Sequence, residues 1–417
     1  MNPISRPTPD PDNAPRLGRL CVILALIAPA LRLTEGAARA VEPSFRAVTV
    51  DGKAAAGRLE SLRDGIVVLE GPGGKKHSIP WKSLVLLERE STTPVTAADR
   101  EQLALPDGDW LAQVALLATT ETSIDVQSDT LGKLTIPIEC VLGFMLSPPA
   151  QSADFESLRN RLTSEPRATE VVWLKNGDAL SGGFLGLTEQ KVVVRVEGKS
   201  VDLDRSGVIA VGFDPTLAAY PARAIDAELV LRDGSRLGLI TPILDDGAIK
   251  ATTRFGPAIK VGLGEIVRLR ARSDAVVYLT DRKPEQADYA SYIGPTRPFR
   301  ADRAVDGRPL RLAGLTHDRG LGMQSRTILA YRIEPGDRRF QASVGIDERA
   351  GPLASAAFRV LVDRREAFRT PALSEHDAPK PIDVDLTGGK HLILITEFGD
   401  RGDIRDFADW VEARIIR

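Results

Sequence analysis

The sequence is poor in the residue types that mark several common classes of protein. Its 417 residues include two cysteines, 5% aromatic residues and four histidines, none of which forms a short-spaced metal-binding pair: His77, His317, His376 and His391. Nucleophile elbows, phosphate loops and dinucleotide-binding turns are absent from the sequence. We therefore expect no catalytic residues, no enzyme activity and no metal site built on histidine.

Charge is balanced, with a formal net charge of −2 and no cluster of basic residues. Nucleic-acid binding needs a concentrated positive field, so we expect no nucleic-acid partner. A hydrolase that uses two carboxylates stays open as an alternative, because any two of the many acids can face each other across a cleft.

The N-terminus has the pattern of a secretory signal peptide over residues 1–40. Arg16 and Arg19 precede an apolar run from Leu20 to Leu31, and Ala38-Arg39-Ala40 provides the small residues of a cleavage site. The run is too short to span a bilayer comfortably, although an uncleaved anchor is the alternative. We expect a secreted or periplasmic protein with no membrane span after cleavage.

Cleavage would leave Cys140 as the sole cysteine, so an internal disulfide is not expected. This thiol follows an apolar segment and is expected to pack as a small buried group.

A weak repeat follows the predicted signal peptide. Each copy has an Asp-Gly or Asn-Gly turn, which favours a hairpin. Each copy ends with a similar, largely apolar segment, the closing phrase, which begins at Ile79, Ile136, Val201 or Ile259. The intervals from turn glycine to closing phrase are 27, 28, 24 and 25 residues. The near-constant interval predicts four small SH3-like or Sm-like β-barrels. Their ranges are residues 41–90, 100–148, 170–215 and 222–271.

An insert at residues 149–169 separates the second and third copies. Phe155, Leu158 and Leu162 are at helical spacing, which predicts a short amphipathic helix capped by Asp154; a linker is the alternative.

Strand patterns separated by glycine and proline turns continue through residues 272–417 and predict a sandwich. The predicted strands are 276–279, 328–333, 340–346, 358–362, 382–386, 392–395 and 410–415. The fold class expected for the whole chain is all-β: several small β-barrel repeats, then a C-terminal jelly-roll β-sandwich.

Three motifs in this last third resemble the NPCBM family of carbohydrate-binding modules. They are the glycine-rich turn Gly320-Leu321-Gly322-Met323-Gln324, the strand end Gly345-Ile346-Asp347, and Asp406-Phe407-Ala408-Asp409-Trp410 near the C-terminus. The resemblance implies a jelly roll that binds a carbohydrate or glycan. Gln324 and Phe407 stand where the family pattern has histidine.

Five residues are candidates for sugar contact: Gln324, Asp347, Arg349, Asp406 and Trp410. Sugar sites combine hydrogen-bonding side chains with an aromatic face. Trp410 is also a natural core residue, and Asp347 can equally cap a loop. Asp400, Asp403, Asp406 and Asp409 recur every third residue, so calcium is a candidate ligand beside the simpler interpretation of a solvated acidic turn.

The sequence leaves two principal interpretations of function. The first is a non-catalytic carbohydrate-binding protein. The second is an interaction scaffold that has lost sugar binding, as the residues at positions 324 and 407 suggest, and that binds a protein partner.

Overall fold

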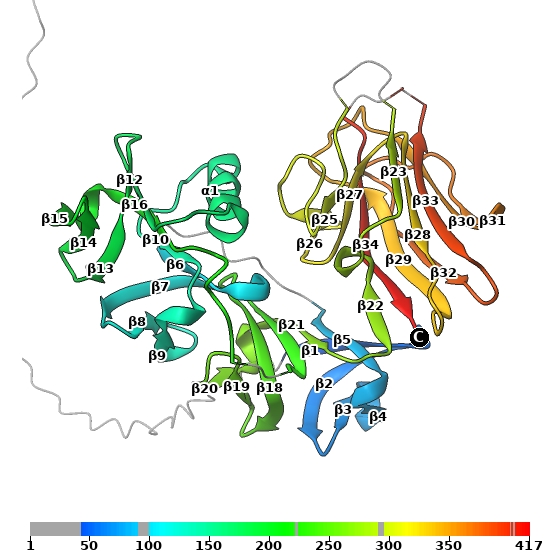
Figure 1. Ribbon diagram of the computed structural model, residues 1–417. Coiled ribbons are helices and arrows are strands. Elements are labelled where there is room, and N and C mark those ends of the chain that lie inside the picture. The colour runs from blue at the N-terminus through cyan, green and yellow to red at the C-terminus, as the bar shows by residue number, and fades with distance from the viewer. Residues whose placement is uncertain (1–42, 91–99, 222–223, 291–295, 401, 403–404) are drawn as a thin grey trace, which may run out of the picture. The chain divides into compact units, whose positions relative to one another are not determined.

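The computed structural model describes residues 43–90, 100–221, 224–290, 296–400, 402 and 405–417. The predicted signal peptide lies outside these ranges. Within them the chain is almost entirely β-strand, with a single α-helix, α1, at Ser152–Ser164 (Figure 1). This confirms the all-β class. Across the described ranges no helix has the length and apolar character needed to cross a membrane.

Four consecutive groups of strands, here called repeat units 1 to 4, occupy residues 44–271. The strands of unit 1 are β1 (Ser44–Thr49), β2 (Ala54–Arg63), β3 (Ile66–Glu70), β4 (Lys76–Pro80) and β5 (Leu84–Arg89). Those of unit 2 are β6 (Glu101–Ala104), β7 (Trp110–Thr119), β8 (Ser123–Ser128), β9 (Gly132–Pro137) and β10 (Gly143–Met145). Unit 3 comprises β11 (Val171–Leu174), β12 (Ala179–Ser181), β13 (Gly183–Leu187), β14 (Lys191–Val196), β15 (Lys199–Asp204) and β16 (Val208–Gly212). Unit 4 comprises β17 (Ala227–Leu231), β18 (Arg236–Asp245), β19 (Ala248–Thr253), β20 (Ala258–Gly262) and β21 (Ile266–Ala271).

The turn that opens each repeat unit has the predicted conformation. Its glycine has a positive φ in all four copies, at Gly52, Gly108, Gly177 and Gly234. This backbone region is accessible to glycine without steric cost, so the Asp-Gly and Asn-Gly pairs correctly marked the hairpins.

The described strands of the repeat units form no closed barrel, and the SH3-like or Sm-like character of the units stays a prediction. In unit 1 the ladder runs β4-β3-β2-β1-β5, and no described pairing joins β4 to β5. The reason is that β5 pairs with β1 on one edge and with β21 of unit 4 on the other. A strand has two edges, so β5 has none left with which to close the barrel.

Units 2 and 3 are joined in the same way. The last strand of unit 2, β10, pairs with β6 on one edge and with β16, the last strand of unit 3, on the other. The repeats are thus paired as 1 with 4 and 2 with 3, each time through their closing strands. A single antiparallel contact, Arg236 with Trp110, connects β18 of one pair to β7 of the other.

Helix α1 packs on the pair formed by units 2 and 3. Leu158 and Leu162 are buried, and the ring of Phe155 meets Trp110 edge-on with centroids 6.3 Å apart. The amphipathic helix is therefore confirmed. Asp154 is not its cap: the N-cap is Gln151, without a side-chain hydrogen bond.

Cys140 is buried in the core of the repeats and its thiol donates to the Ala219 carbonyl at 3.4 Å. Burial raises the pKa of this thiol to about 11, so it is an unreactive packing residue, as predicted.

The C-terminal third is a two-sheet sandwich, which we call the sandwich domain. One sheet contains β22 (Val276–Tyr278), β24 (Arg300–Ala301), β27 (Gly320–Gln324), β29 (Arg339–Ile346), β32 (Lys380–Asp385) and β34 (Phe407–Ile416). The other contains β23 (Gln286–Tyr289), β28 (Thr327–Arg332), β30 (Ala356–Val362), β31 (Arg365–Arg369) and β33 (His391–Phe398). A small hairpin is formed by β25 (Leu310–Leu312) and β26 (Leu315–His317).

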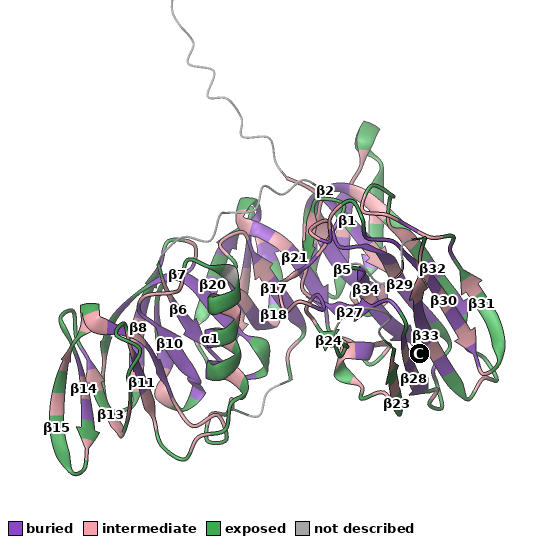
Figure 2. Cartoon of the chain, turned by 90° about the horizontal axis from the view of Figure 1, so that it is seen from above, coloured by how far each residue is buried: buried purple, intermediate pink, exposed green. Residues whose placement is uncertain are grey.

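A continuous apolar core fills the space between the two sheets of the sandwich domain. Strands such as β29 and β34 are buried along most of their length, whereas the edge strand β31 is largely exposed (Figure 2). The alternating pattern of residues 340–346 correctly predicted that one face of β29 packs in this core, with Phe340, Ala342, Val344 and Ile346.

Gly143 tests the pairing of units 2 and 3. It has φ +154°, and a Cβ there would lie 2.5 Å from the Val211 carbonyl oxygen on β16 and 2.8 Å from Leu162 Cδ2 on α1. We expect Gly143→Ala to lower the free energy of unfolding by about 2–4 kcal/mol, because it adds backbone strain and a steric clash. Urea denaturation followed by circular dichroism measures the change. At Gly264 a Cβ meets nothing within 4 Å, so Gly264→Ala is the matched control. Equal effects at the two positions would contradict this account of the pairing.

Candidate functional site

The three motifs of the last third converge on one sheet of the sandwich domain. β34 lies between β27 and β29, so that Asp409 is the register partner of Gly322 on one side and of Gly345 on the other. Gln324 is paired in the same ladder with Phe407. The two positions that depart from the family pattern are therefore cross-strand neighbours.

Two of the glycines make room for a covering segment of the domain. A Cβ on Gly322 would lie 2.3 Å from the Arg303 carbonyl oxygen, and one on Gly345 would lie 3.2 Å from Leu312. Ala304, Leu310 and Leu312 form a small second core with Val411 of β34. The residues from 303 to 312 thus pass directly over the sheet.

Polar contacts fasten the same segment. Asp409 accepts a hydrogen bond from the Arg311 backbone N–H at 3.0 Å, and Arg349 donates to the Pro309 carbonyl. Arg349 also binds both carboxylate oxygens of Asp347, at 2.9 and 2.6 Å. Asp347 is buried and both of its carboxylate oxygens are bound by Arg349. These two residues, predicted as sugar contacts, therefore fix the segment that contains Pro309.

Asp409 lies beside a second buried acid in this arrangement. Burial, together with the neighbouring Asp347, raises the pKa of Asp409 well above its ordinary value. Its Oδ1 has no conventional hydrogen-bond donor among the described residues. A proton on this carboxyl turns it into a donor to Asp347, which removes the repulsion between two buried acids.

Trp410 and Asp406, two further predicted sugar contacts, lie in the interior of the domain and are not exposed to a ligand. The Trp410 ring is fully buried, meets Phe358 edge-on at 5.5 Å and donates from Nε1 to Thr396 Oγ1 at 3.0 Å. Asp406 is also fully buried and accepts from Ser325 Oγ at 2.7 Å and from the Ser355 N–H at 2.8 Å. A ring with no exposed surface cannot stack against a sugar.

The aspartates considered for calcium do not provide a common site in the described part of the chain. Asp403 lies outside it, while Asp406 and Asp409 have the separate partners given above. No group of three or more His, Cys, Asp or Glu side chains there is arranged to hold a metal ion.

Gln324 is the candidate that reaches a surface hollow. The hollow is a shallow dip with no room for a water molecule, and it lies where β23, β27 and the start of β28 meet. It is lined by Tyr289, Ala290, Thr296, Arg297, Gln324, Ser325 and Thr327. The amide oxygen of Gln324 is buried and has no hydrogen-bond partner among the described residues. An unsatisfied buried acceptor of this kind costs about 1–3 kcal/mol.

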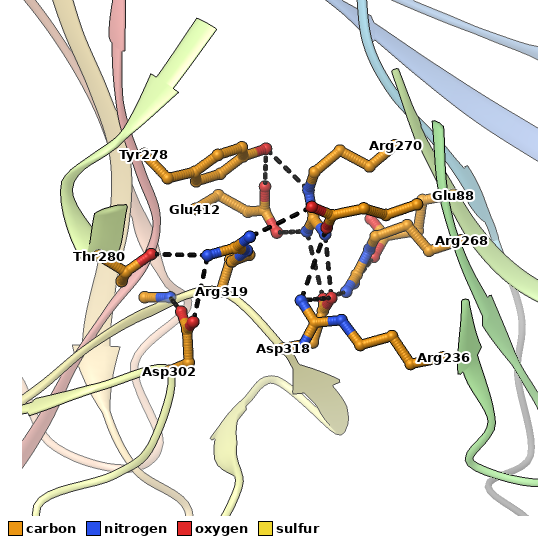
Figure 3. A network of polar contacts seen from close by, with 12 residues as sticks. Glu88, Arg236, Arg268, Arg270, Tyr278, Thr280, Asp302, Asp318, Arg319 and Glu412 are labelled. Carbon is orange, nitrogen blue, oxygen red and sulfur yellow. Dashed lines mark hydrogen bonds and ion pairs between the residues drawn. The ribbon is translucent and has the colours of Figure 1, made fainter. Parts of the chain in front are cut away.

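A dense cluster of ion pairs lies elsewhere, between the sandwich domain and repeat units 1 and 4 (Figure 3). Arg270 on β21 is fully buried and donates to Asp318 at 2.9 Å, to Glu412 at 2.7 Å and to Tyr278 at 2.9 Å. Asp318 also binds Arg268, and Arg236 at 3.1 Å. We call this set the junction cluster; its other acids are Glu88 and Glu228.

Strand register explains how these charges come together. Arg268 pairs with Glu88 across β21 and β5, and Arg270 pairs with Glu228 across β21 and β17. Burial alone would raise the pKa of Asp318, but Arg270, Arg268 and Arg236 outweigh burial and hold that pKa well below its ordinary value. Likewise, the guanidiniums overcome burial at Glu228 and lower its pKa to about 2. Each acid of the cluster thus lies against at least one arginine, so the buried charges are paired.

The glycine-rich stretch near residue 320 consequently has two roles. Asp318 and Arg319 belong to the junction with the repeats, and Arg319 binds Glu228 at 3.2 Å and Asp281 at 2.7 Å. Gln324 at the far end of β27 lines the hollow.

Sequence reasoning missed the arginines beside Phe407. Arg297 and Arg405 lie over the Phe407 ring, with the guanidinium carbon 5.7 and 5.9 Å from the ring centroid. Neither arginine belongs to one of the three motifs. The sequence offered one signal for them, the aromatic residue Phe407 at a position where the family pattern has histidine.

With this geometry in view, the C-terminal third is a two-sheet β-sandwich whose motif residues mostly secure its own chain. Residues 275–416 match the family model described as NPCBM/NEW2 domain. The C-terminal third of this chain thus matches a family of carbohydrate-binding modules.

Individual proteins are similar to parts of the chain. It is 28% identical over 159 residues to a Renibacterium salmoninarum protein named "Putative endo-alpha-N-acetylgalactosaminidase"; the match covers 35% of this chain and 10% of that protein. The chain therefore spans about a tenth of the curated relative it matches.

Among solved structures, the CBM51 of Clostridium perfringens GH95 in complex with methyl-galactose is 23% identical. The match covers 34% of this chain and 99% of that chain, with a TM-score of 0.31. The tandem CBM51 modules of a family 98 glycoside hydrolase from Streptococcus pneumoniae are 14% identical, covering 62% of this chain and 90% of theirs, with a TM-score of 0.31.

The junction cluster generates a stability prediction. Asp318→Asn would leave Arg268 and Arg270 buried without their shared anion. We expect the free energy of unfolding to fall by about 3–5 kcal/mol, as when one partner of a buried ion pair is removed. The control is Arg332→Gln, which breaks an exposed pair with Glu285 at 3.9 Å and should cost less than about 1 kcal/mol. Calorimetry compares the two variants, and a mild effect of Asp318→Asn would argue against a stabilising junction.

The Asp347–Asp409 pair generates a pH prediction. Because the folded protein keeps a proton on Asp409 that the unfolded chain loses above about pH 4, this residue makes the free energy of unfolding fall as pH rises. Asp409→Asn supplies a permanent amide donor and removes that titration. We expect the thermal midpoint of the variant to gain on the wild type between pH 4 and pH 7. Asp288→Asn, on an exposed strand position, should run parallel to the wild type. Parallel curves for Asp409→Asn as well would show that Asp409 is ionised in the folded state.

Proposed function

We propose that the protein is a secreted or periplasmic, non-catalytic carbohydrate-binding protein, and that the sugar binds at the hollow beside Gln324. The NPCBM/NEW2 match over residues 275–416 carries the class of ligand. The position of the site rests on Gln324, which lines the hollow and whose buried amide oxygen has no hydrogen-bond partner among the described residues. The signal-peptide pattern of residues 1–40 supports export.

The hollow is too shallow to enclose a ligand, since it has no room for a water molecule, whereas enclosed small-molecule pockets measure roughly 300–1,000 Å³. A sugar would therefore lie on the surface beside Gln324. The lining of the hollow includes the side chains of Tyr289 and Thr296, which carry hydroxyl groups, whereas the hydroxyl of Ser325 donates to Asp406. Hydroxyls that both donate and accept match the hydrogen-bonding groups of a sugar ring.

The repeat units support this function by presenting the sandwich domain. The junction cluster connects them to the domain through buried, paired charges. We propose no glycosidase activity for this chain, which covers a tenth of the relative that bears such a name.

A glycan array probed with the full chain, with and without calcium, tests the proposal. We expect binding to a defined subset of glycans, and a loss of at least about tenfold in affinity for Gln324→Ala, because a hydrogen bond to the sugar is removed. Gln286→Ala, on the exposed side of β23, should bind as the wild type does. Thermal melting of each variant checks that the fold is kept.

Absence of binding in both calcium conditions would overturn the proposal and would favour the scaffold interpretation. Equal affinities of wild type and Gln324→Ala would move the site away from the hollow.

A further inference from the structure

A second cavity is lined by a different set of residues from the hollow beside Gln324. It is an open groove with a free volume of about 410 Å³, which is within the roughly 300–1,000 Å³ of small-molecule sites. Five of its eight lining residues lie outside the segment 275–416 that matches the family model. The lining residues are Ile225, Arg272, Ser273, Asp274, Val276, Val277, Asp281 and Arg417.

The groove forms where repeat unit 4 continues into the sandwich domain. The chain between β21 and β22 makes a turn in which the Ala275 N–H donates to Ser273 Oγ at 3.0 Å. The Arg272 N–H donates to the Asp226 carbonyl at 2.8 Å, which holds the start of β17 beside this turn. The Arg417 N–H donates to the Ala275 carbonyl at 2.9 Å, so the end of β34 lies beside the turn as well. Backbone hydrogen bonds therefore fix the walls of the groove.

Two charged side chains of the lining are held by their neighbours. Arg272 Nε lies 3.3 Å from Glu228, and its Nη1 lies 3.7 Å from Asp281. Asp281 also accepts from Arg319 at 2.7 Å. Glu228 belongs to the junction cluster, and Arg319 is bound to it. Because these positions are set before a ligand arrives, less entropy is lost on binding.

Other polar groups of the lining are left for a ligand. Asp274 is exposed, and in the described part of the chain its carboxylate makes no hydrogen bond or ion pair. The Ser273 hydroxyl accepts from Ala275, but its own proton has no acceptor among the residues that the structure describes. Two consecutive residues thus offer a donor and an acceptor at the groove.

The composition of the lining favours an uncharged ligand that is rich in hydroxyl groups. Two arginines and two aspartates line the groove, so their formal charges cancel and the groove attracts neither anions nor cations over a long range. A hydroxyl group both donates and accepts, so it can bind arginine and aspartate alike. Ile225, Val276 and Val277 are half-buried and provide apolar contact for the C–H groups of a sugar ring.

We infer that this groove binds a neutral sugar unit, whose hydroxyls bind Asp274 and Ser273 while its ring packs on Val277. The inference goes beyond the proposed function, because it gives the chain a second carbohydrate site that is partly built by repeat unit 4. It shares the class of ligand with the proposed function but rests on its own cavity and lining. A glycan that reaches two sites on one chain binds more tightly than a single sugar unit.

Isothermal titration calorimetry of the full chain tests the inference. The probes are the neutral disaccharides lactose, chitobiose, cellobiose and maltose, and sialyl-lactose is the charged comparison. We expect Asp274→Ala to lower the affinity for a bound neutral disaccharide by about tenfold or more, because a hydrogen bond to a charged acceptor is lost. Asp274→Asn keeps an amide oxygen as acceptor and should lose less.

Control variants separate the groove from general effects on the protein. Glu121→Ala removes an exposed acid of repeat unit 2 and should bind as the wild type does. Gln324→Ala should leave the affinity of the groove unchanged. The Asp274 variants remove no contact within the described part of the chain, so thermal melting should give the wild-type midpoint.

The outcomes distinguish the groove from the hollow. Binding that persists in Gln324→Ala and weakens in Asp274→Ala supports the groove. Binding that is equal in wild type and Asp274→Ala but weaker in Gln324→Ala would overturn the groove and leave the proposed function standing. Tighter binding of sialyl-lactose than of lactose, dependent on Asp274, would refute the neutral class of ligand. Absence of binding to every probe would overturn the groove as a sugar site.

Discussion

A β-strand has two edges, and this limit governs the architecture of the chain. The last strands of units 1 and 2, β5 and β10, each pair along one edge with a strand of their own unit and along the other edge with a strand of a partner unit. Barrel closure and unit pairing compete for the same backbone groups, and pairing prevails. Four units that each lack a closed sheet thereby become two pairs with shared ladders.

The pairing of units 1 and 4 also creates the surface on which the sandwich domain is held. Strands β5, β21 and β17 lie side by side, so Glu88, Arg268, Arg270 and Glu228 project from neighbouring strands. Charges at such density are costly to bury alone, and Asp318 and Glu412 from the sandwich domain complete their neutralisation. The ionic junction is therefore a product of strand register. Charged residues outside the family motifs connect the sandwich domain to the repeats.

Sequence patterns predicted the features that depend on local rules. The turn glycines at 52, 108, 177 and 234, the helix near residue 158 and the alternating strand at 340–346 all follow from the preferences of neighbouring residues. The pairing of the repeat units could not be predicted from the sequence, because strands pair edge to edge through backbone groups that are the same in every sequence. Trp410 was a candidate ligand contact and lies in the core, since its motif also specifies packing. Arg297 was missed because its partner ring is supplied by a distant strand, and an isolated arginine carries no pattern.

The nested order of pairing has a consequence for how the chain is made. Unit 1 emerges first from the ribosome, yet its partner β21 ends at Ala271, after units 2, 3 and 4 have been synthesised. Until then one edge of β5 is unpaired, and its residues Leu84 to Leu87, which are buried in the folded protein, are less well covered. Units 2 and 3, adjacent in sequence, can complete their contact earlier. Long-range strand contacts form slowly and expose nascent chains to aggregation. The sequence order thus allows the inner pair to form before the outer pair, and leaves the outer edge of β5 uncovered until β21 has been made.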